Sequence, residues 1–583
     1  MNVAPLSAWQ RVRIPLLAVA ISSIVTLTAV GLIALVRLCT NLSFHGIIST
    51  APSKPDFTTW GTWGIAVPVF GGLIIGVMAR WGSPAIRGHG IPEAMQAIGT
   101  AESRIPGRVA ILKPLSAAIS IGSGGPFGAE GPIIATGGAI GSLVGQGLST
   151  SPVQRKILLA AGAAAGMTAI FGTPLAAVLL AVELLLFEYR GRSFLPVALA
   201  AGTAMALRSL FHEPLPMFPF VFNATPDLPL SCGAFLIGAA SGLLAVILTK
   251  AVYAVEDGFE KLPLHWMWWP AIGGLAVGII GWFQPRTMGV GYDNLRELLD
   301  GNLAVSFIAS LAILKFLSWT IALGSGTSGG TLAPIMTVGG AAGALFAHAL
   351  NGIPMFAHFP IGLGVLIGMS ATFAGASRAF LASVAFAYEA THAISSFGPL
   401  LLGCGAAVMV SRVLMRETIM TEKLARRGLR IPSDYEPDFL HACQVNQMME
   451  IHPLTVGPQE TASDLARRLG TPGSPWHDVR LIPIVTPENA LLAVISRTDV
   501  FAALEAAPEA TVLQSGVLRP VTIHPDAPMS EAINLMIQHG IGRLPVVDQS
   551  PTPKLLGLLT RQAILEARRQ QLETNRIRAT VTT

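Results

Sequence analysis

Three glycine-rich stretches of the chain contain the residue types of an anion-binding site. They are GHGIPE at Gly88–Glu93, GSGGPFGAEGP at Gly122–Pro132 and GSGTSGGTLAP at Gly324–Pro334, and a helix-compatible run follows each. Glycine lets the backbone approach a ligand, and proline is tolerated in the first turn of a helix. That turn presents free N–H groups and about half a positive charge. The three stretches therefore predict helix starts that hold an anion without a fixed cation.

Close helix packing is the alternative explanation for these glycines, because small residues let membrane helices approach one another. We prefer packing for Gly137–Gly138 and Gly339–Gly340, which have no proline beside them. A helix start flanked by proline is not needed for packing, so the three longer stretches favour anion binding.

Glu130 is the only ionisable residue between Lys113 and Arg155, and it lies inside the second stretch. A carboxylate is costly inside a membrane and is a functional candidate by default. At an anion site it would compete with the anion for the same N–H donors and would leave when protonated. We therefore expect Glu130 to be a gate and proton acceptor; the alternative is a structural carboxylate with a local partner.

The composition indicates that these elements lie in a membrane. Hydrophobic residues make up 52% of the 583 residues and charged residues only 12%, against about 25% charged in soluble domains. Apolar runs long enough to span hydrocarbon recur at 14–36, 62–79, 233–254, 267–282 and 394–414. The first run is too long for a removable signal peptide, so we expect a retained helix.

Charge and cysteine content narrow the class further. Basic residues crowd the chain after the last apolar run, which predicts a cytoplasmic flank and a cytoplasmic C-terminal region: Arg412, Arg416, Lys423, Arg426, Arg427 and Arg430. The net charge of +5 has no basic–aromatic pattern, so we expect no nucleic-acid partner. The four cysteines are far apart, and neither a disulfide framework nor a metal site is expected.

The first 430 residues contain an internal repeat. Gly122-Ser-Gly recurs at Gly324-Ser-Gly, an offset of 202 residues that also pairs Lys113 with Lys315 and Gly128 with Gly330. After a four-residue insertion, Glu183 pairs with Glu389. Glycine-broken segments at matching places in two halves predict a transport site at the interface of the halves. Identity alone does not reveal whether the halves are inverted.

A second repeat lies in the C-terminal region, where Pro453–Asp464 matches Pro520–Glu531. Each copy carries a short helical pattern and then an apolar run of β type, at Leu481–Val485 and Leu544–Val547. This pattern predicts a soluble tandem α/β module. We divide the chain into a membrane domain (1–430), a linker (431–445), a tandem module (446–572, with repeats 446–510 and 511–572) and a polar tail (573–583).

The glycine-rich motifs resemble the three signatures of the CLC family of chloride channels and proton/chloride exchangers, over about residues 14–430, and the module is similar to a tandem CBS-domain pair. The resemblance implies an all-α polytopic membrane domain of tilted, broken helices in an inverted repeat, a homodimer with one pore per subunit, and a bacterial inner membrane. It implies transport of chloride rather than enzymatic chemistry, with no required cofactor. The anion-binding residues carried over are Gly88, His89, Gly90, Ile91, Pro92, Gly128, Ala129, Gly131, Thr331, Leu332 and Met420.

Four departures from the family pattern bear on mechanism. His89 replaces the central-site serine, where it could donate an N–H to the anion, carry a full charge at acid pH, or cap a helix and point away. Ala129 replaces the arginine before the gating glutamate. Leu184 stands where exchangers often carry a second, inward-facing glutamate, and Glu188, one turn later, is a candidate substitute. Met420 aligns with the central-site tyrosine.

The leading hypothesis is chloride transport coupled to proton antiport through Glu130. A passive, gated chloride channel is the alternative, motivated by Leu184 and Met420, and selectivity for nitrate or fluoride is less favoured. A nucleotide-sensing regulator with a membrane anchor is disfavoured, because an anchor needs no duplicated, glycine-broken helices.

CBS pairs often bind adenine nucleotides, and the resemblance implies Ser496 and Asp499 of the first repeat as ribose ligands. The second repeat offers Thr560 without the acid. A purely structural or dimer-supporting module is the alternative.

Overall fold

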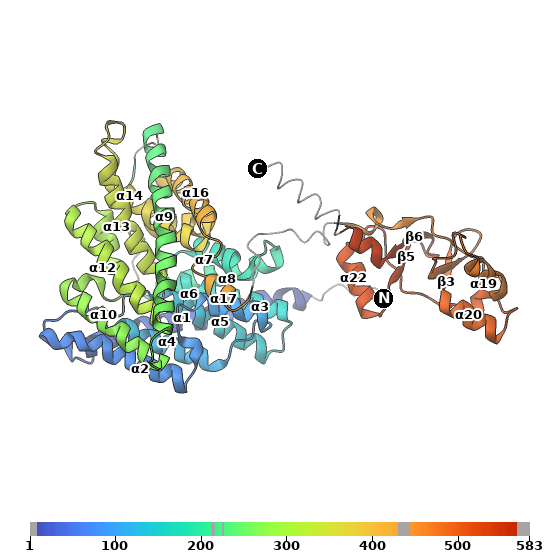
Figure 1. Cartoon of the computed structure of the whole chain (residues 1–583), viewed down its shortest axis with the longest axis horizontal. Helices are drawn as coiled ribbons and strands as arrows, with labels where there is room; N and C mark the ends of the chain where they lie inside the picture. The colour runs from blue at the N-terminus through green and yellow to red at the C-terminus, as the bar shows by residue number, and fades with distance from the viewer. Residues whose placement is uncertain are drawn as a thin grey trace. The chain divides into compact units, whose positions relative to one another are not determined.

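The computed structural model describes residues 8–211, 216–223, 225, 227–429, 443–567 and 569 (Figure 1). The chain divides into two compact units, Met1–Ser433 and Asp434–Thr583. The predicted linker 431–445 lies mostly outside the described residues, and the predicted tail 573–583 lies wholly outside them.

The regular elements in the described residues of the first unit are all helices. Eight helical segments in the described ranges are long and apolar enough to cross a membrane, and they include all five apolar runs that the sequence predicts. The α-helices of this unit are α1 (Ala8–Thr40), α2 (Val67–Trp81), α3 (Ile91–Thr100), α4 (Gly107–Gly122), α5 (Glu130–Gly147), α6 (Pro152–Phe171), α7 (Pro174–Ala181), α8 (Gly191–Arg208), α9 (Leu228–Glu260), α10 (Trp269–Phe283), α11 (Tyr292–Leu299), α12 (Val305–Gly324), α13 (Leu332–Leu350), α14 (Ile361–Ser377), α15 (Phe380–Thr391), α16 (Phe397–Leu414) and α17 (Glu422–Arg426).

The internal repeat gives matching helices in the two halves. Helices α4, α5, α6 and α7 of the first half correspond in sequence to α12, α13, α14 and α15 of the second. Figure 1 shows the first half in blue and cyan and the second in green to orange. Several helices are too short to span a bilayer of roughly 30 Å, because glycine and proline end or start them inside the unit.

The paired glycines of α5 and α13 provide close helix packing. A Cβ built on Gly137 would lie 2.2 Å from the Gly162 carbonyl oxygen of α6, and one on Gly339 would lie 2.6 Å from the Gly368 carbonyl oxygen of α14. A side chain at either position would push the helices apart. The packing interpretation of these glycines is therefore confirmed.

Two glutamates cap helices of the opposite half. The Glu183 carboxylate, just after α7, accepts hydrogen bonds from the backbone N–H groups of Leu381 (3.0 Å) and Ala382 (3.0 Å) at the start of α15. The Glu389 carboxylate, near the end of α15, accepts hydrogen bonds from the N–H groups at the start of α7, at Leu175 (2.9 Å) and Ala176 (2.8 Å). The two repeat-related segments thus cap each other's helix starts, and this reciprocal contact indicates a two-fold relation between the halves.

The second unit contains two small antiparallel sheets with helices, as the α/β pattern predicts. One sheet has the order β2-β3-β4 and the other β1-β6-β5. Its elements are β1 (Glu450–Ile451), α19 (Ala462–Gly470), β2 (Leu481–Val485), β3 (Leu491–Ser496), α20 (Arg497–Ala506), α21 (Val512–Ser515), β4 (Val517–Leu518), α22 (Met529–Gln538), β5 (Arg543–Val547) and β6 (Leu555–Thr560).

The two repeats of this unit exchange edge strands. Strand β1 comes from the first repeat but pairs with β6 of the second. Strand β4 comes from the second repeat but pairs with β3 of the first. Each sheet is thus completed by a short segment from the other side of the sequence division.

Candidate functional site

The second and third glycine-rich stretches meet through their backbones. The Gly128 N–H donates to the Gly330 carbonyl (N···O 3.4 Å), and the Gly330 N–H donates to the Gly128 carbonyl (3.0 Å). These two glycines occupy the same position in the two halves of the repeat. The starts of α5 and α13 are therefore held against each other on the local two-fold.

The first glycine-rich stretch joins the same point. The Gly88 N–H donates to the Thr327 carbonyl (3.1 Å), and the Gly329 N–H donates to the Gly88 carbonyl (3.4 Å). A Cβ built on Gly131 would lie 2.3 Å from the His89 carbonyl oxygen and 3.0 Å from the Gly330 Cα. All three stretches converge, and a side chain at Gly131 would prevent the approach.

Each of the three stretches starts a helix as predicted. Gly90 precedes α3 with φ +91°, a conformation that favours glycine, and the Glu93 carboxylate accepts its N–H (2.9 Å). Ala129 precedes α5, and Thr331 precedes α13. The residues before α5 and α13 provide no side-chain cap, so the first N–H groups of both helices face the point where the stretches meet, and that of Ala333 in α13 lies toward the Glu130 carboxylate.

The Glu130 side chain is fully buried at the first residue of α5. Its Oε1 accepts a hydrogen bond from the Tyr292 hydroxyl. Its Oε2 has no hydrogen-bond partner among the described residues. A Cβ on Gly128 would lie only 1.7 Å from that oxygen, so the carboxylate folds back over Gly128 into the place where the stretches meet.

A fourth glycine-rich loop, which the sequence analysis missed, reaches the same region. The loop Gly289-Val-Gly291 precedes Tyr292, the first residue of α11, and Gly289 and Gly291 both have positive φ, at +62° and +80°. Gly88 and Gly90 of the first half also have positive φ. The new loop lies 201 residues after Gly88-His-Gly90, close to the 202-residue offset of the repeat, and this spacing could have identified it.

Two buried lysines fix the loops of the two halves in the same way. Lys113 donates to the carbonyls of Ile86 (2.8 Å) and Gly88 (2.6 Å). Lys315 donates to the carbonyls of Thr287 (2.9 Å) and Gly289 (3.0 Å). Both side chains are fully buried. Each ammonium group donates hydrogen bonds to two loop carbonyls, so these carbonyl oxygens point toward the lysine.

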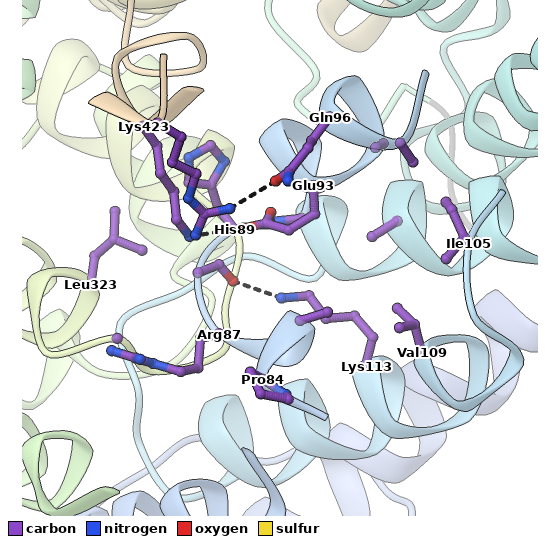
Figure 2. Close-up of a pocket in the computed structure, with 18 of the residues that line it drawn as sticks. Pro84, Arg87, His89, Glu93, Gln96, Ile105, Val109, Lys113, Leu323 and Lys423 are labelled. Atoms are coloured by element: carbon purple, nitrogen blue, oxygen red, sulfur yellow. Dashed lines mark hydrogen bonds and ion pairs between the residues drawn. The ribbon is translucent and has the colours of Figure 1, made fainter. Parts of the chain in front are cut away.

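A cavity of about 580 Å³ opens beside the first stretch and α5. Its lining includes His89, Glu93, Ala135 and Lys423. Figure 2 shows Glu93 beside Lys423, their Oε1 and Nζ 2.8 Å apart, with His89 close by. Ala135 lies five residues after Glu130, about 7.5 Å along α5, and Glu130 itself is not among the described residues that line the cavity.

His89 is one of the residues that line this cavity. Its side chain is only 5% exposed, and its Nδ1 has no hydrogen-bond partner among the described residues. A buried imidazole nitrogen without a partner is costly. The ring hydrogen-bonds the Ile419 backbone, its Nδ1 stays available to a ligand in the cavity, and it provides no side-chain cap to α3.

The remaining predicted transport residues are buried among apolar side chains or contact polar side chains near them in sequence. Met420 is buried, and its neighbour Ile419 lines the cavity. Leu184 is buried in an apolar environment. Glu188 accepts a hydrogen bond from the Ser193 hydroxyl (2.6 Å) and lies 3.7 Å from the Arg190 guanidinium. Neither Leu184 nor Glu188 is among the described residues that line the cavity.

The predicted nucleotide residues lie at helix starts of the second unit. The Ser496 hydroxyl accepts the Asp499 N–H (3.1 Å) and donates to its carboxylate (2.6 Å), a reciprocal cap of α20. The Thr560 hydroxyl accepts the Ala563 N–H (3.2 Å). Both hydroxyls thus satisfy backbone groups of their own helices.

Comparison with known proteins identifies the class. The sequence model of a family described as "Voltage gated chloride channel" matches residues 71–412, and that of the CBS domain matches residues 445–506 and 517–570. The chain therefore belongs to the CLC family and carries a CBS pair. It is a CLC-type chloride transporter with a multi-pass membrane domain, in a class of channels and transporters rather than enzymes.

Individual relatives agree with this assignment. The chain is 26% identical over 406 residues to a putative chloride channel protein ClcB-like of Ralstonia nicotianae, covering 67% of this chain and 92% of the relative. It is 28% identical over 368 residues to the voltage-gated ClC-type chloride channel ClcB of Escherichia coli, covering 62% and 87%.

Solved structures share the fold. A slow cyanobacterial Cl-/H+ antiporter gives a TM-score of 0.63 at 24% identity, over 71% of this chain and 98% of that one. A eukaryotic CLC transporter gives 0.61 at 18% identity, over 95% and 98%.

Proposed function

We propose that this protein exchanges chloride for protons, with Glu130 as both the gate of the anion path and the proton acceptor. The observation that carries the proposal is the position of this carboxylate. It is buried where the starts of α5 and α13 meet, with Oε2 against the Gly128 backbone. A negatively charged side chain there occupies the place that a chloride ion would take.

Competition between carboxylate and chloride follows from this geometry. The helix starts supply N–H groups and partial positive charge, which attract an anion without holding it as tightly as a full cation would. The ionised carboxylate uses those groups and blocks the path. Protonation removes its charge, so the side chain yields the place to chloride and carries a proton with it.

The proton side of the exchange needs a route from the cavity. Leu184 cannot relay a proton, and Glu188 is bonded to Ser193. Glu93, His89 and Ala135 of α5 line the cavity, which is large enough to hold water that carries protons toward Glu130. The passive channel stays the second candidate, favoured by the apolar side chains of Leu184 and Met420.

Flux measurements on the full chain in liposomes test the proposal. A chloride gradient should drive proton movement in the opposite direction, recorded with a pH-sensitive dye. The variant Glu130→Gln should abolish proton movement while chloride still passes, and Glu505→Gln, an exposed residue of α20, should behave as the unchanged protein. Robust chloride flux without any pH change in the unchanged protein would leave the passive channel.

The same measurements bear on selectivity. Chloride is the substrate class of the family, and the geometry at His89 supports an extra N–H donor on the anion path. An anion series with chloride, nitrate and fluoride in the same liposomes ranks the substrates.

We further propose that the protein is a homodimer in a bacterial inner membrane with its CBS pair in the cytoplasm. The basic residues that follow α16 support this orientation, because positive flanks favour the cytoplasmic side. An adenine nucleotide at Ser496, Asp499 and Thr560 stays a prediction. The capping bonds of these residues support the structural alternative.

A further inference from the structure

We infer that Tyr292 is a second gating residue, which holds the Glu130 carboxylate in the anion path through its hydroxyl group. The inference rests on the proposed role of Glu130 and adds a residue that controls it. Tyr292 is the first residue of α11, and its hydroxyl donates to Glu130 Oε1. Among the described residues, it provides the side-chain hydrogen bond that this carboxylate accepts.

The Tyr292 ring is held in place by aromatic contacts. Its centroid lies 5.8 Å from that of Phe171 at the end of α6, and 5.9 Å from that of Phe218. The Phe218 N–H in turn donates to the Ala390 carbonyl (2.8 Å). Contacts from two other segments fix the direction of the hydroxyl, so its aim at the carboxylate belongs to the fold.

The position of Tyr292 in the repeat shows that this hydroxyl is specific to one half. At the 201-residue offset of the fourth loop, Tyr292 corresponds to Ile91, and at the 202-residue offset Glu130 corresponds to Leu332. The symmetry-related position therefore carries two apolar residues, Ile91 of the first half and Leu332 of the second, where the fourth loop and α5 bring together a donor and an acceptor. The duplicated scaffold does not itself require a hydroxyl or a carboxylate.

The charged groups that face this pair come from two other helices. Lys315 of α12 lies near the carboxylate, and Arg208 of α8 lies near the tyrosine. Lys315 donates to the carbonyls of Thr287 and Gly289 in the fourth loop. Arg208 donates to the carbonyls of Ala169 and Ile170. Lys315 supplies a field at Glu130 and Arg208 a field at Tyr292, and the Tyr292 hydroxyl supplies the side-chain hydrogen bond to the carboxylate.

A hydrogen bond to the ionised carboxylate favours the charged, path-blocking form. Removal of the hydroxyl should therefore let protonation open the gate at a higher pH. In liposome flux assays, Tyr292→Phe should move the pH midpoint of chloride flux upward by about one pH unit and raise flux several-fold at neutral pH. Tyr388→Phe, which also loses one hydroxyl but lies beside Phe397, should match the unchanged protein.

A double-variant comparison separates a gating role from a structural one. Chloride flux in Glu130→Ala should no longer depend on this hydroxyl, so Glu130→Ala with Tyr292→Phe should equal Glu130→Ala alone. Replacing Tyr292 with a fluorinated, more acidic tyrosine keeps the shape, strengthens the donor and should move the midpoint downward. This substitution does not depend on the stability of the Phe variant.

Two outcomes would overturn the inference. One is a pH profile of Tyr292→Phe that matches Tyr388→Phe, and the other is an equal effect of Tyr292→Phe with and without Glu130. Failure of the proposed function has a different signature, because Glu130→Gln would then leave proton movement unchanged.

Discussion

Gly128 and Gly330 stand at the same position of the two repeat halves and exchange a pair of backbone hydrogen bonds with each other. The local two-fold axis therefore passes between them. The proposed anion path lies at this axis, because the helices that follow both glycines begin there. The Glu130 carboxylate lies on one side only, so the gate that we propose is asymmetric although the scaffold is symmetric.

The close approach at this point predicts a strong effect of one methyl group. In Gly131→Ala the new Cβ would meet the His89 carbonyl oxygen at 2.3 Å, and backbone must shift. We expect chloride turnover in liposomes to fall at least about tenfold, since an overpacked site costs on the order of 1–3 kcal/mol. Gly147→Ala in the same helix, where nothing lies within 4 Å, is the matched control. Equal turnover of the two variants would refute this account.

The reciprocal caps predict symmetric losses of stability. Glutamine at position 183 or 389 keeps one acceptor oxygen and turns an amide NH₂ group toward the second backbone N–H. Each variant should lower the free energy of unfolding by about 1.5–3 kcal/mol, seen as a lower thermal midpoint in detergent. Glu505→Gln should leave the midpoint unchanged. A loss at only one of the two positions would contradict the two-fold interpretation.

The buried lysines should be structural rather than anion ligands. Lys315→Met leaves the carbonyls of Thr287 and Gly289 without a donor, at about 1–3 kcal/mol for each buried group. We expect a lower thermal midpoint and similar behaviour of Lys113→Met. Lys250→Met, at an exposed position of α9, is the control. Unchanged stability together with altered chloride affinity would instead make the lysines ligands.

His89 should act as a hydrogen-bond donor to the anion. His89→Ala should weaken chloride affinity about tenfold, because a hydrogen bond to a charged group contributes about 1.5–3 kcal/mol. His89→Ser, which restores a donor, should recover part of the affinity. Isothermal titration with chloride measures both. Identical affinities for the Ala and Ser variants would exclude donation from this side chain.

Much of the site could be predicted from the sequence because its chemistry is local. A proline or glycine beside a helix start has the same meaning wherever the fold places it, so Gly88–Pro92, Gly128–Pro132 and Gly330–Pro334 identified the helix starts. The repeat offset identified the matching halves. The isolated acid Glu130 needed only its apolar surroundings to be noticed.

The remaining features depend on tertiary structure. Tyr292 follows a loop with no proline, so no helix-start motif marks it. The 201-residue spacing of that loop differs by one from the 202-residue offset of the repeat, so the offset does not pair it with the first stretch. Strand β1 has two residues, too few for an alternating pattern, and its partner in the other repeat is fixed only by folding. The Glu183 and Glu389 caps join segments about 200 residues apart.

These caps also set the order in which the membrane domain can mature during synthesis. The N–H groups at Leu175 and Ala176 leave the ribosome 213 or more residues before the Glu389 side chain that will satisfy them. At a synthesis rate of about 5–20 residues per second, these N–H groups stay without their acceptor for roughly 10–40 s. The N-terminal half therefore enters the membrane with an open helix end, and it becomes complete only when the C-terminal half has been made.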